Sequence, residues 1–307
     1  MSILIEADEL RALVQQDAPV RVLDVRWSLA QPDGRPAYLA GHIPGAVYVD
    51  LEADLAGHGA PSDGRHPLPA VDDLQAAARR WGIDDGDTVV VYDDLGNLSS
   101  ARAWWLLGHA GVSDVRMLDG ALRAWTDAGL PLEHGERTIT RGTVHLSYGS
   151  RATLAIDEAA ELARTGVLLD ARAPERFRGD VEPVDPRAGH IPGAVNAPAA
   201  VTLDATGRFL PREQLRATFE ALGVRPDAPT GVYCGSGVMA AADIAALALA
   251  GFDAALYPGS WSAWSNTPGR PVATGLAAPA ATAPAVARAT TAAQTPGATN
   301  RRAATDE

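Results

Sequence analysis

Short apolar runs alternate with longer amphipathic segments along most of the chain. The runs at 21–25, 88–92 and 114–118 predict buried strands, and the segments at 72–81 and 101–109 predict helices. Strands that alternate with helices in this way are typical of a mostly parallel sheet that is covered by helices on both faces. The pattern therefore predicts an α/β fold.

The chain also contains an internal repeat. The heptapeptide Gly-His-Ile-Pro-Gly-Ala-Val occurs unchanged at 41–47 and at 189–195. Three more pairs of segments match in the same order: 22–26 with 168–172, 90–93 with 231–234, and 120–125 with 259–264. Four ordered matches predict two copies of one α/β unit.

The repeat divides the chain into four parts. We expect a first domain at 1–138, an irregular linker at 139–152 and a second domain at 153–274. The remaining segment, 275–307, is rich in alanine, threonine and proline and has few large apolar residues. Such a segment buries too little surface to offset its chain entropy, so we expect a disordered tail.

The composition narrows the possible functions. The net charge is −12 at pH 7, and all 26 basic residues are arginine. An acidic chain is a poor partner for nucleic acid or for an anionic membrane surface, and we expect neither. Because the sequence contains no lysine, a Schiff-base lysine, a pyridoxal phosphate anchor and a P-loop lysine are excluded.

The N-terminal segment 1–9 lacks a basic region and soon becomes acidic, so it is not a secretory signal. No run of about 18 uninterrupted apolar residues occurs, and no transmembrane helix is expected. The seven histidines lack metal-ligand spacing, and the single cysteine permits no internal disulfide. We therefore expect a cytoplasmic protein without a metal or other cofactor.

The single cysteine, Cys234, is the strongest candidate for chemistry. It follows the apolar run 231–233, opens a small-residue loop at 234–237 and precedes the alanine-rich segment 238–242. A strand, a tight loop and a helix in this order place the thiol at free backbone N–H groups and at the positive end of a helix dipole. Both stabilise the thiolate, which is the reactive form. The alternative is a buried cysteine that acts as a small hydrophobic residue.

The first copy has Asp93 where the second has Cys234. The loop continues with Asp94, and two carboxylates would repel an anionic substrate. A carboxylate also cannot replace a thiolate as a sulfur nucleophile, so we expect the first domain to be non-catalytic. A carboxylate pair for acid–base work or for binding a cation is the alternative.

The residues after Cys234 argue against several cysteine chemistries. A phosphatase-like or arsenate-handling loop needs an arginine six residues after the cysteine, where this chain has Ala240. A thioredoxin-like motif needs a second cysteine at position 237, which is glycine. A cysteine protease needs a histidine base near the thiol, and nothing in the sequence suggests one. Attack on an electrophilic sulfur, with a persulfide on Cys234, remains.

Over residues 5–274 the sequence resembles the tandem-domain rhodaneses, because the repeated blocks and the cysteine loop occur together. The loop Cys-Gly-Ser-Gly-Val at 234–238 is similar to that of the 3-mercaptopyruvate sulfurtransferases. Thiosulfate sulfurtransferases usually carry Cys-Arg-Lys-Gly-Val instead. Met239 stands where the mercaptopyruvate group usually has threonine, which removes one hydroxyl from the rim of the loop.

The resemblance implies roles for particular residues. Those implied to bind the substrate are Arg176, Arg187, Gly235, Gly237, Val238 and Met239. The implied catalytic residues are Cys234 and a relay of Ser236, His42 and Asp33. The twin of His42, His190, occupies the same repeated motif, so a structural role for both histidines is the alternative.

The resemblance also implies the partners. They are a small-molecule sulfur donor and a thiol acceptor, such as a thioredoxin-like protein, or cyanide. Two other functions stay open: a thiosulfate:cyanide sulfurtransferase, and a non-catalytic persulfide carrier or partner-binding module.

Overall fold

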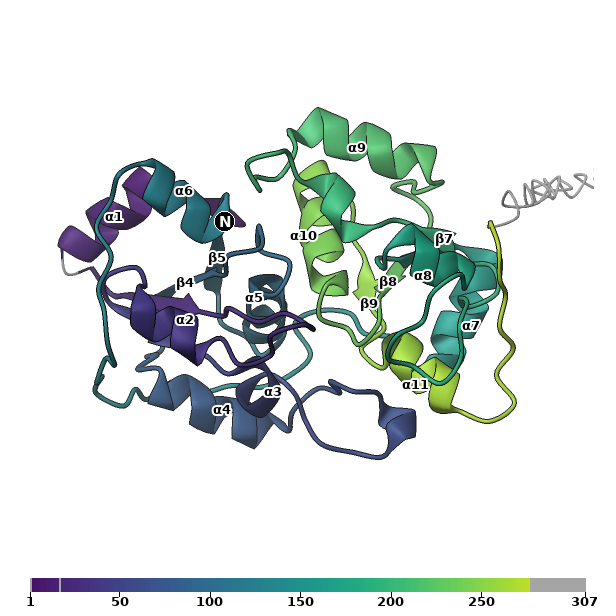
Figure 1. Ribbon diagram of the computed structural model, residues 1–307, viewed down its shortest axis with the longest axis horizontal. Helices are drawn as coiled ribbons and strands as arrows, with labels where there is room; N and C mark the ends of the chain where they lie inside the picture. The colour runs from purple at the N-terminus through teal and green to yellow at the C-terminus, as the bar shows by residue number, and fades with distance from the viewer. Residues whose placement is uncertain (1, 17, 277–307) are drawn as a thin grey trace, which may run out of the picture.

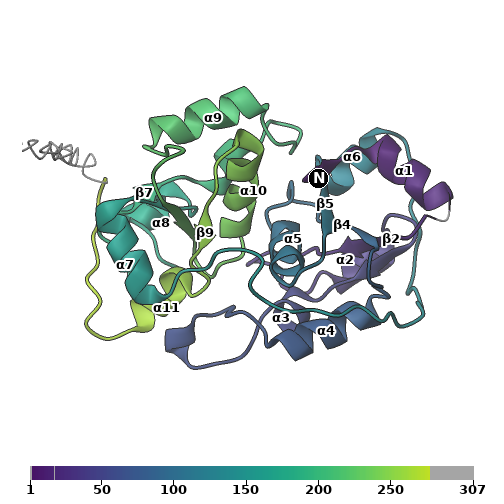
Figure 2. The same ribbon diagram turned by 180° about the vertical axis from the view of Figure 1, so that it is seen from behind.

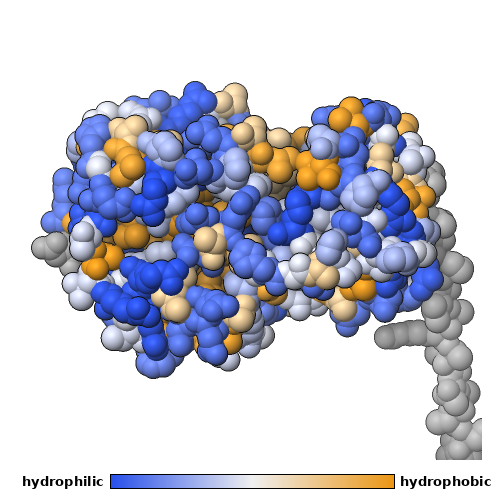
Figure 3. Space-filling model, turned by 60° about the horizontal axis from the view of Figure 1, so that its bottom comes forward, coloured by the Kyte–Doolittle hydropathy of each residue, from blue (hydrophilic) through white to orange (hydrophobic). Residues whose placement is uncertain are grey.

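The computed structural model describes residues 2–16 and 18–276 as two α/β units that lie side by side (Figure 1). This confirms the predicted fold class. Figure 3 shows the units as two lobes separated by a narrowing, with a mostly polar surface on which apolar residues are scattered. The predicted tail from residue 277 onward lies outside the described residues. Within the described ranges, no helix has the length and apolar character needed to cross a bilayer.

The first sheet contains five parallel strands in the order β1-β5-β4-β2-β3. They are β1 (Leu4–Ile5), β2 (Val20–Asp24), β3 (Ala46–Tyr48), β4 (Thr88–Tyr92) and β5 (Asp114–Leu118). β4 and β5 have the predicted bounds, and β2 is shifted by one residue. β4 lies in the middle of the sheet, where its uninterrupted apolar sequence is buried on both faces.

Helices cover both faces of this sheet (Figures 1 and 2). They are α1 (Ala7–Gln15), α2 (Arg35–Ala40), α3 (Leu51–Asp54), α4 (Val71–Arg80), α5 (Ser100–His109) and α6 (Ala121–Asp127), with a short 3₁₀ turn at Pro61–Asp63. Val89 and Val91 belong to the core that includes α4 and α5. Val90 and Tyr92 belong to the core that includes α1 and α6. Successive residues of β4 therefore supply opposite layers.

The second unit repeats this plan with the strand order β7-β6-β8-β9, and all its strand pairs are parallel. The strands are β6 (Val167–Asp170), β7 (Val195–Asn196), β8 (Thr230–Tyr233) and β9 (Ala255–Leu256). The helices are α7 (Ile156–Thr165), α8 (Pro174–Arg178), α9 (Arg212–Ala221), α10 (Ala240–Ala250) and α11 (Ser260–Asn266), with a 3₁₀ turn at Ala199–Thr202.

Helices α5 and α10 join the two units. They pack against each other at the boundary between the two units, here called the seam (Figure 1). One hydrophobic core includes residues of both helices. α10 is apolar on nearly every side because its own sheet covers one face and α5 covers another. Each of these helices follows a loop at the carboxyl end of a strand, Asp93 before α5 and Cys234 before α10, so the seam brings both loops to one place.

Matched ion pairs hold the strand ends in both units. Arg26 donates to Asp24 at 2.6 Å and to the carbonyl of Gly41 at 2.8 Å. In the second unit Arg172 donates to Asp170 at 2.7 Å and to the corresponding carbonyl, that of Gly189, at 2.7 Å. Each arginine thereby ties a strand end to the repeated Gly-His-Ile-Pro segment.

Candidate active site

The loop after β8 fixes the position of Cys234. The thiol is almost completely buried, and the N–H of Gly237 donates to its Sγ at 3.2 Å. The carbonyl of Cys234 accepts from the N–H of Trp261 at 2.9 Å. Gly237 has φ of +77°, and a Cβ there would lie 2.7 Å from the carbonyl oxygen of Pro258. Only glycine suits this backbone conformation and this close approach. Gly237 is therefore needed to form the loop around Cys234 Sγ, here called the cradle.

The loop keeps further N–H groups available. Within the described residues, the backbone N–H groups of Ser236, Val238 and Met239 donate no hydrogen bond to another protein group. They belong to the turn that wraps the sulfur and leads into α10. Free N–H groups at a helix N-terminus stabilise a negative charge, so the loop can hold an anionic sulfur or the oxyanion of a substrate.

The corresponding loop of the first unit is already filled by its own side chain. Asp93 is fully buried, and its carboxylate accepts four backbone hydrogen bonds of 2.8–2.9 Å. The donors are Leu95, Asn97, Ser99 and Ser100. Burial raises the pKa of Asp93, and the four N–H donors oppose that rise. The loop thus satisfies its own donors.

Ser236 is paired with a histidine that the sequence analysis did not select. His66 Nδ1 lies 2.7 Å from Ser236 Oγ, and His66 Nε2 lies 3.9 Å from a carboxylate oxygen of Glu52. Burial and the neighbouring Arg102 and Arg65 lower the pKa of His66 to about 4, so the ring is neutral at pH 7. Since a carboxylate only accepts, the tautomer with the proton on Nε2 suits both neighbours and leaves Nδ1 to accept from Ser236.

The structure corrects the prediction for His42 and Asp33, because it does not bring either residue to Ser236. His42 is buried in the first unit, where Nδ1 lies 2.9 Å from the carbonyl oxygen of Tyr38 and its ring stacks on Tyr38 at 4.0 Å. His190 makes the matching contacts with Phe177, at 2.8 Å and 3.7 Å. Both histidines therefore brace the repeated motif.

Asp33 is exposed and accepts from the backbone N–H of Arg35 at 3.0 Å, at the start of α2. The acidic residue beside the relay is Glu52 instead. It also accepts a hydrogen bond of 3.3 Å from the indole N–H of Trp27, which holds its carboxylate near His66.

The fully buried Arg102 on α5 connects the histidine with the cysteine loop. It donates to the carbonyl of Gly237 at 3.2 Å and to the carbonyl of His66 at 3.0 Å. Its remaining acceptors are the carbonyls of Leu55 and Pro67, so its charge has no carboxylate partner among the described residues. Burial lowers the pKa of Arg102 to about 10, which keeps it protonated, and its positive charge attracts the negative charge of a Cys234 thiolate.

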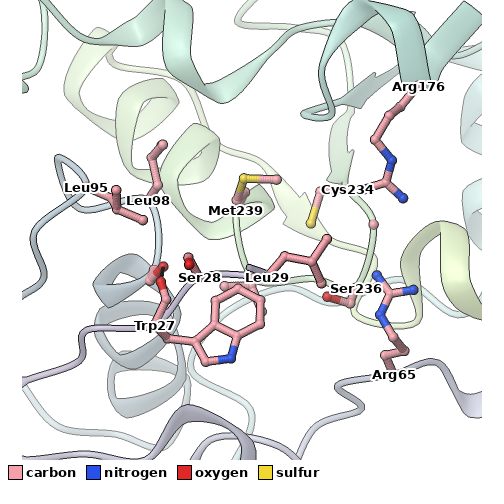
Figure 4. Close-up of a pocket in the computed structure, with 13 residues that line it drawn as sticks. Trp27, Ser28, Leu29, Arg65, Leu95, Leu98, Arg176, Cys234, Ser236 and Met239 are labelled. Atoms are coloured by element: carbon pink, nitrogen blue, oxygen red, sulfur yellow. Dashed lines mark hydrogen bonds between the residues drawn. The ribbon is translucent and has the colours of Figure 1, made fainter. Parts of the chain in front are cut away.

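Two arginines reach the site, but Arg187 is not one of them. Arg176 lies beside Cys234, as predicted, and it is joined by Arg65 from the first unit (Figure 4). The guanidinium of Arg187 donates to the carbonyls of Trp264, Ser265, Thr267 and Arg270, at and beyond the end of α11. Its position is corrected accordingly: it satisfies the last carbonyls of a helix instead of facing the cavity.

A cavity of about 120 Å³ lies next to the thiol. Trp27, Leu29, Leu95, Leu98, Val238 and Met239 form its apolar lining, and Ser28, Arg65, Ser99, Arg176 and Ser236 supply polar groups beside Cys234 and Gly235. Leu29 and Leu95 remain about half exposed. Figure 4 shows the apolar residues of the first unit on one side of the thiol and the two arginines on the other. The site therefore has one hydrophobic wall and one charged wall.

In the part of the chain that the structure describes, no three histidine, cysteine or acidic side chains come together as a metal site. The chemistry that the geometry supports is nucleophilic. It combines a buried thiol, free N–H groups, a serine–histidine pair and two guanidinium groups around one small cavity.

Comparison with known proteins places these features in a wider group. The sequence profile of the rhodanese-like domain matches residues 6–128 and 155–267. A protein of Mycobacterium tuberculosis named as a thiosulfate sulfurtransferase, SseB, is 51% identical over 90% of this chain and 98% of its own length. A protein of Pseudomonas aeruginosa named as a 3-mercaptopyruvate sulfurtransferase is 47% identical over 89% of this chain and 98% of its own length.

A solved structure shows the same arrangement. The crystal structure of SseA from Escherichia coli, described as having a "Rhodanese" fold, aligns with a TM-score of 0.77 and 34% identity over 85% of this chain and 99% of that chain. The names of the two relatives in sequence differ in the sulfur donor. The choice of donor for this chain therefore rests on its own site.

Proposed function

The chain belongs to the rhodanese-like family, and we propose that it transfers sulfur from 3-mercaptopyruvate to a thiol or to cyanide through a persulfide on Cys234. The Cys234 thiolate attacks the donor sulfur while the carbon–sulfur bond of the donor breaks. The bonding electrons leave on the carbon as pyruvate enolate, which takes up a proton to become pyruvate. An acceptor thiolate or cyanide then takes the outer sulfur and restores the Cys234 thiolate.

The observation that carries the choice of donor is the hydrogen bond of 2.7 Å between Ser236 and His66 beside Cys234. The enolate from mercaptopyruvate needs a proton at carbon, whereas sulfite, the product from thiosulfate, leaves as a stable anion without one. Neutral His66 polarises the Ser236 hydroxyl, and that hydroxyl passes the proton of the donor thiol to the enolate carbon. The proton then moves within the complex, and no outside acid is needed.

The cysteine loop supports the same step. Gly237 already donates to Sγ, and the N–H groups of Ser236, Val238 and Met239 are available to the sulfur anion or to the enolate oxygen. Fixed donors of this kind stabilise a developing charge without reorganising. The buried guanidinium of Arg102 adds a positive charge behind the loop.

For the second half-reaction we propose a small thiol or a thioredoxin-like protein as the acceptor. Cys234 is buried and its cavity is small, so an acceptor must present its sulfur at the end of a narrow group. A reducing compartment such as the cytoplasm supplies such thiols and keeps the lone cysteine reduced.

The test is a comparison of kcat/KM for 3-mercaptopyruvate and for thiosulfate with one acceptor thiol. We expect pyruvate to form with multiple turnovers and 3-mercaptopyruvate to be the better donor. A clear preference for thiosulfate would support the second candidate function. The observation that favours this candidate is the pair of guanidinium groups near the loop, because two cations suit a compact dianion. A single slow uptake of sulfur without turnover would indicate a persulfide carrier.

A further inference from the structure

A second cavity, here called the seam cavity, lies between the two units. Its volume is about 430 Å³, which is within the range of cavities that hold small molecules. Trp104 and Trp105 of α5 and Ile244 and Ala248 of α10 line it, together with Arg151 from the segment between α6 and α7. The seam cavity shares no lining residue with the cavity beside the thiol. It is therefore separate from the active site.

The seam cavity and the cysteine loop lie against different faces of α5. Arg102 donates to the carbonyl of Gly237 in the cysteine loop, and Trp104 follows it by two residues on the helix. Helix side chains two residues apart point about 200° away from each other. A ligand beside Trp104 is therefore not held against the reacting sulfur.

Arg151 brings a positive charge to the seam cavity without a negative partner. Its Cζ lies 3.8 Å from the centre of the Trp104 ring, and a Cβ on Gly108, one turn further along α5, would overlap with its guanidinium. Nη1 is buried and has no hydrogen-bond partner within the described residues. Burial lowers the pKa of Arg151 to about 10, and no neighbouring carboxylate opposes this change. The group stays charged at pH 7 and unpaired.

The end of α5 does not account for this arginine. Arginines near the end of a helix often donate to its last carbonyls, as Arg187 does at α11. Here the last carbonyls already accept from backbone N–H groups, namely those of Leu106, Leu107, Gly108 and His109 from Ala110, Val112, Gly111 and Ser150. Arg151 is therefore not a helix cap.

A second donor in the lining also lacks an acceptor. Trp105 is completely buried, and its Nε1 has no hydrogen-bond partner within the described residues. Indole and guanidinium N–H groups donate and never accept, so both unpartnered atoms need an acceptor. A buried donor without one costs free energy, and two such donors in the lining of one cavity call for an acceptor that arrives with a ligand.

We propose that the seam cavity is a second binding site, which takes a small carboxylate with a flat apolar body. Carboxylate oxygens only accept hydrogen bonds, so they supply what Arg151 and Trp105 lack. The rings of Trp104 and Phe252, which also lines the cavity, suit a flat apolar body. Asp253 is an exposed carboxylate in the lining and would repel a polyanion, which favours a ligand with one negative charge. This inference does not depend on the proposed function.

The experiment is a calorimetric titration of the full chain with phenylacetate, which joins one carboxylate to one flat ring. We expect a dissociation constant below about 1 mM for the wild type, a modest affinity for a ligand of this size. Arg151→Gln should weaken binding by about 10- to 100-fold, the effect of removing a charge-assisted hydrogen bond. Phenylacetamide, a neutral molecule of the same shape, should bind the wild type at least about 10-fold more weakly. No binding of phenylacetate to the wild type, or equal binding of the amide, would overturn the proposal.

Two further variants locate the bound phenylacetate. Arg141→Gln removes an exposed arginine of the same segment and should leave the affinity unchanged. Arg176→Gln removes a guanidinium beside Cys234 and should also leave it unchanged. Loss of binding in Arg176→Gln with retention in Arg151→Gln would place phenylacetate in the active site. Equal loss in Arg141→Gln would mean that general charge attracts it. Either result would contradict the proposal.

The stability of the protein without a ligand separates a binding role of Arg151 from a structural one. Arg151→Met keeps an apolar stem and removes a buried charge that lacks a partner, so its thermal midpoint should equal or exceed that of the wild type. Phenylacetate should raise the midpoint of the wild type but not that of the variant. A lower midpoint for Arg151→Met without ligand would make Arg151 a structural residue and would also overturn the proposal.

Discussion

The two loops at the seam have the same place in the repeat but different anions. In the first unit, Asp93 brings a built-in carboxylate that accepts four backbone hydrogen bonds. In the second unit, Cys234 receives one such bond from Gly237, and neighbouring N–H groups stay available. The same cradle therefore stabilises the fold in one copy and is open to a reacting anion in the other. The backbone N–H groups can take part in catalysis only in the second unit, where a reacting anion rather than a carboxylate of the protein accepts from them.

The first loop and the helix that follows it also contribute to the active site. Leu95, Leu98 and Ser99, which follow Asp93, line the cavity beside Cys234. Arg102, nine residues after Asp93, reaches the carbonyl of Gly237 across the seam. The loop that lacks the cysteine therefore forms part of the cavity wall beside the cysteine loop and supports that loop through Arg102.

The helices that follow the two loops carry different charged residues at corresponding positions. Arg102 on α5 carries a charge into the cysteine loop, whereas Asp243, nine residues after Cys234, is fully buried on α10. Both carboxylate oxygens of Asp243 lack hydrogen-bond partners within the described residues, and burial raises its pKa well above the usual range. The helix α5 therefore brings the positive charge of Arg102 to the cysteine loop, whereas burial of Asp243 on α10 favours its neutral form.

The largest effect is expected from removing the thiol of Cys234 or moving it to position 93. Cys234→Ser should lower turnover by roughly 10³-fold or more, because a hydroxyl at this position does not form a persulfide. The double variant Asp93→Cys with Cys234→Ser should not recover it, since the first loop lacks the serine–histidine pair and the arginines. Pyruvate release under multiple turnover is the measurement. Recovery of activity in the double variant would show that the loop alone determines function.

The next effect concerns proton delivery, which the first loop does not provide. Ser236→Ala should lower kcat for 3-mercaptopyruvate by about 10²-fold, because general acid–base catalysis contributes at least that much. Turnover of thiosulfate should fall far less, since its product needs no proton at carbon. Ser28→Ala is the matched control, because Ser28 lines the same cavity and its Oγ accepts from the backbone N–H of Gln31. Equal losses for both donors would remove the assigned role of Ser236.

The built-in anion of the first loop should matter for stability and not for chemistry. Asp93→Ala leaves four buried N–H groups without their acceptor and should lower the free energy of unfolding by about 3 kcal/mol. Asp94→Ala, at the exposed neighbour, should change it by less than about 0.5 kcal/mol. Urea unfolding followed by tryptophan fluorescence measures both. Stability losses of similar size would contradict the contrast between the loops.

The smallest effect is a dependence of stability on pH. The pKa of His66 is lowered from 6.5 to about 4 in the folded protein, so the unfolded chain takes up a proton at a higher pH than the folded one. Stability is therefore lost as the pH falls from about 6.5 towards 4, by about 2 kcal/mol at pH 5. His66→Gln should lack this part of the loss when the thermal midpoints at pH 7 and pH 5 are compared. An identical pH dependence in the variant would mean that His66 is not held neutral by burial.

Much of the fold, and the identity of the nucleophile, could be predicted from local sequence. The uninterrupted apolar run of β4 and the small residues around Cys234 reflect constraints within a few residues, so they could be predicted. The repeat extended this to the second unit and to the exchange of Cys234 for Asp93.

The partners of the nucleophile could not be predicted in the same way. His66 and Arg65 lie in the irregular segment between α3 and α4, outside the four repeated blocks that the sequence analysis matched. They reach the site only because the two units pack across the seam. Arg187 matched a substrate-binding arginine of the family in sequence. In the structure its guanidinium donates to four carbonyls at the end of α11 and lies away from the cavity. Contacts between distant segments decide such cases, and a single sequence does not encode them locally.

The central claim is that Cys234 carries the transferred sulfur in a cradle that its twin fills with a carboxylate. Its most direct test is the mass of the intact protein after addition of 3-mercaptopyruvate without an acceptor, followed by peptide mapping. We predict one added sulfur atom on the peptide that contains Cys234, formed together with one pyruvate and removed by a thiol. Release of pyruvate with no sulfur on Cys234 would contradict the account.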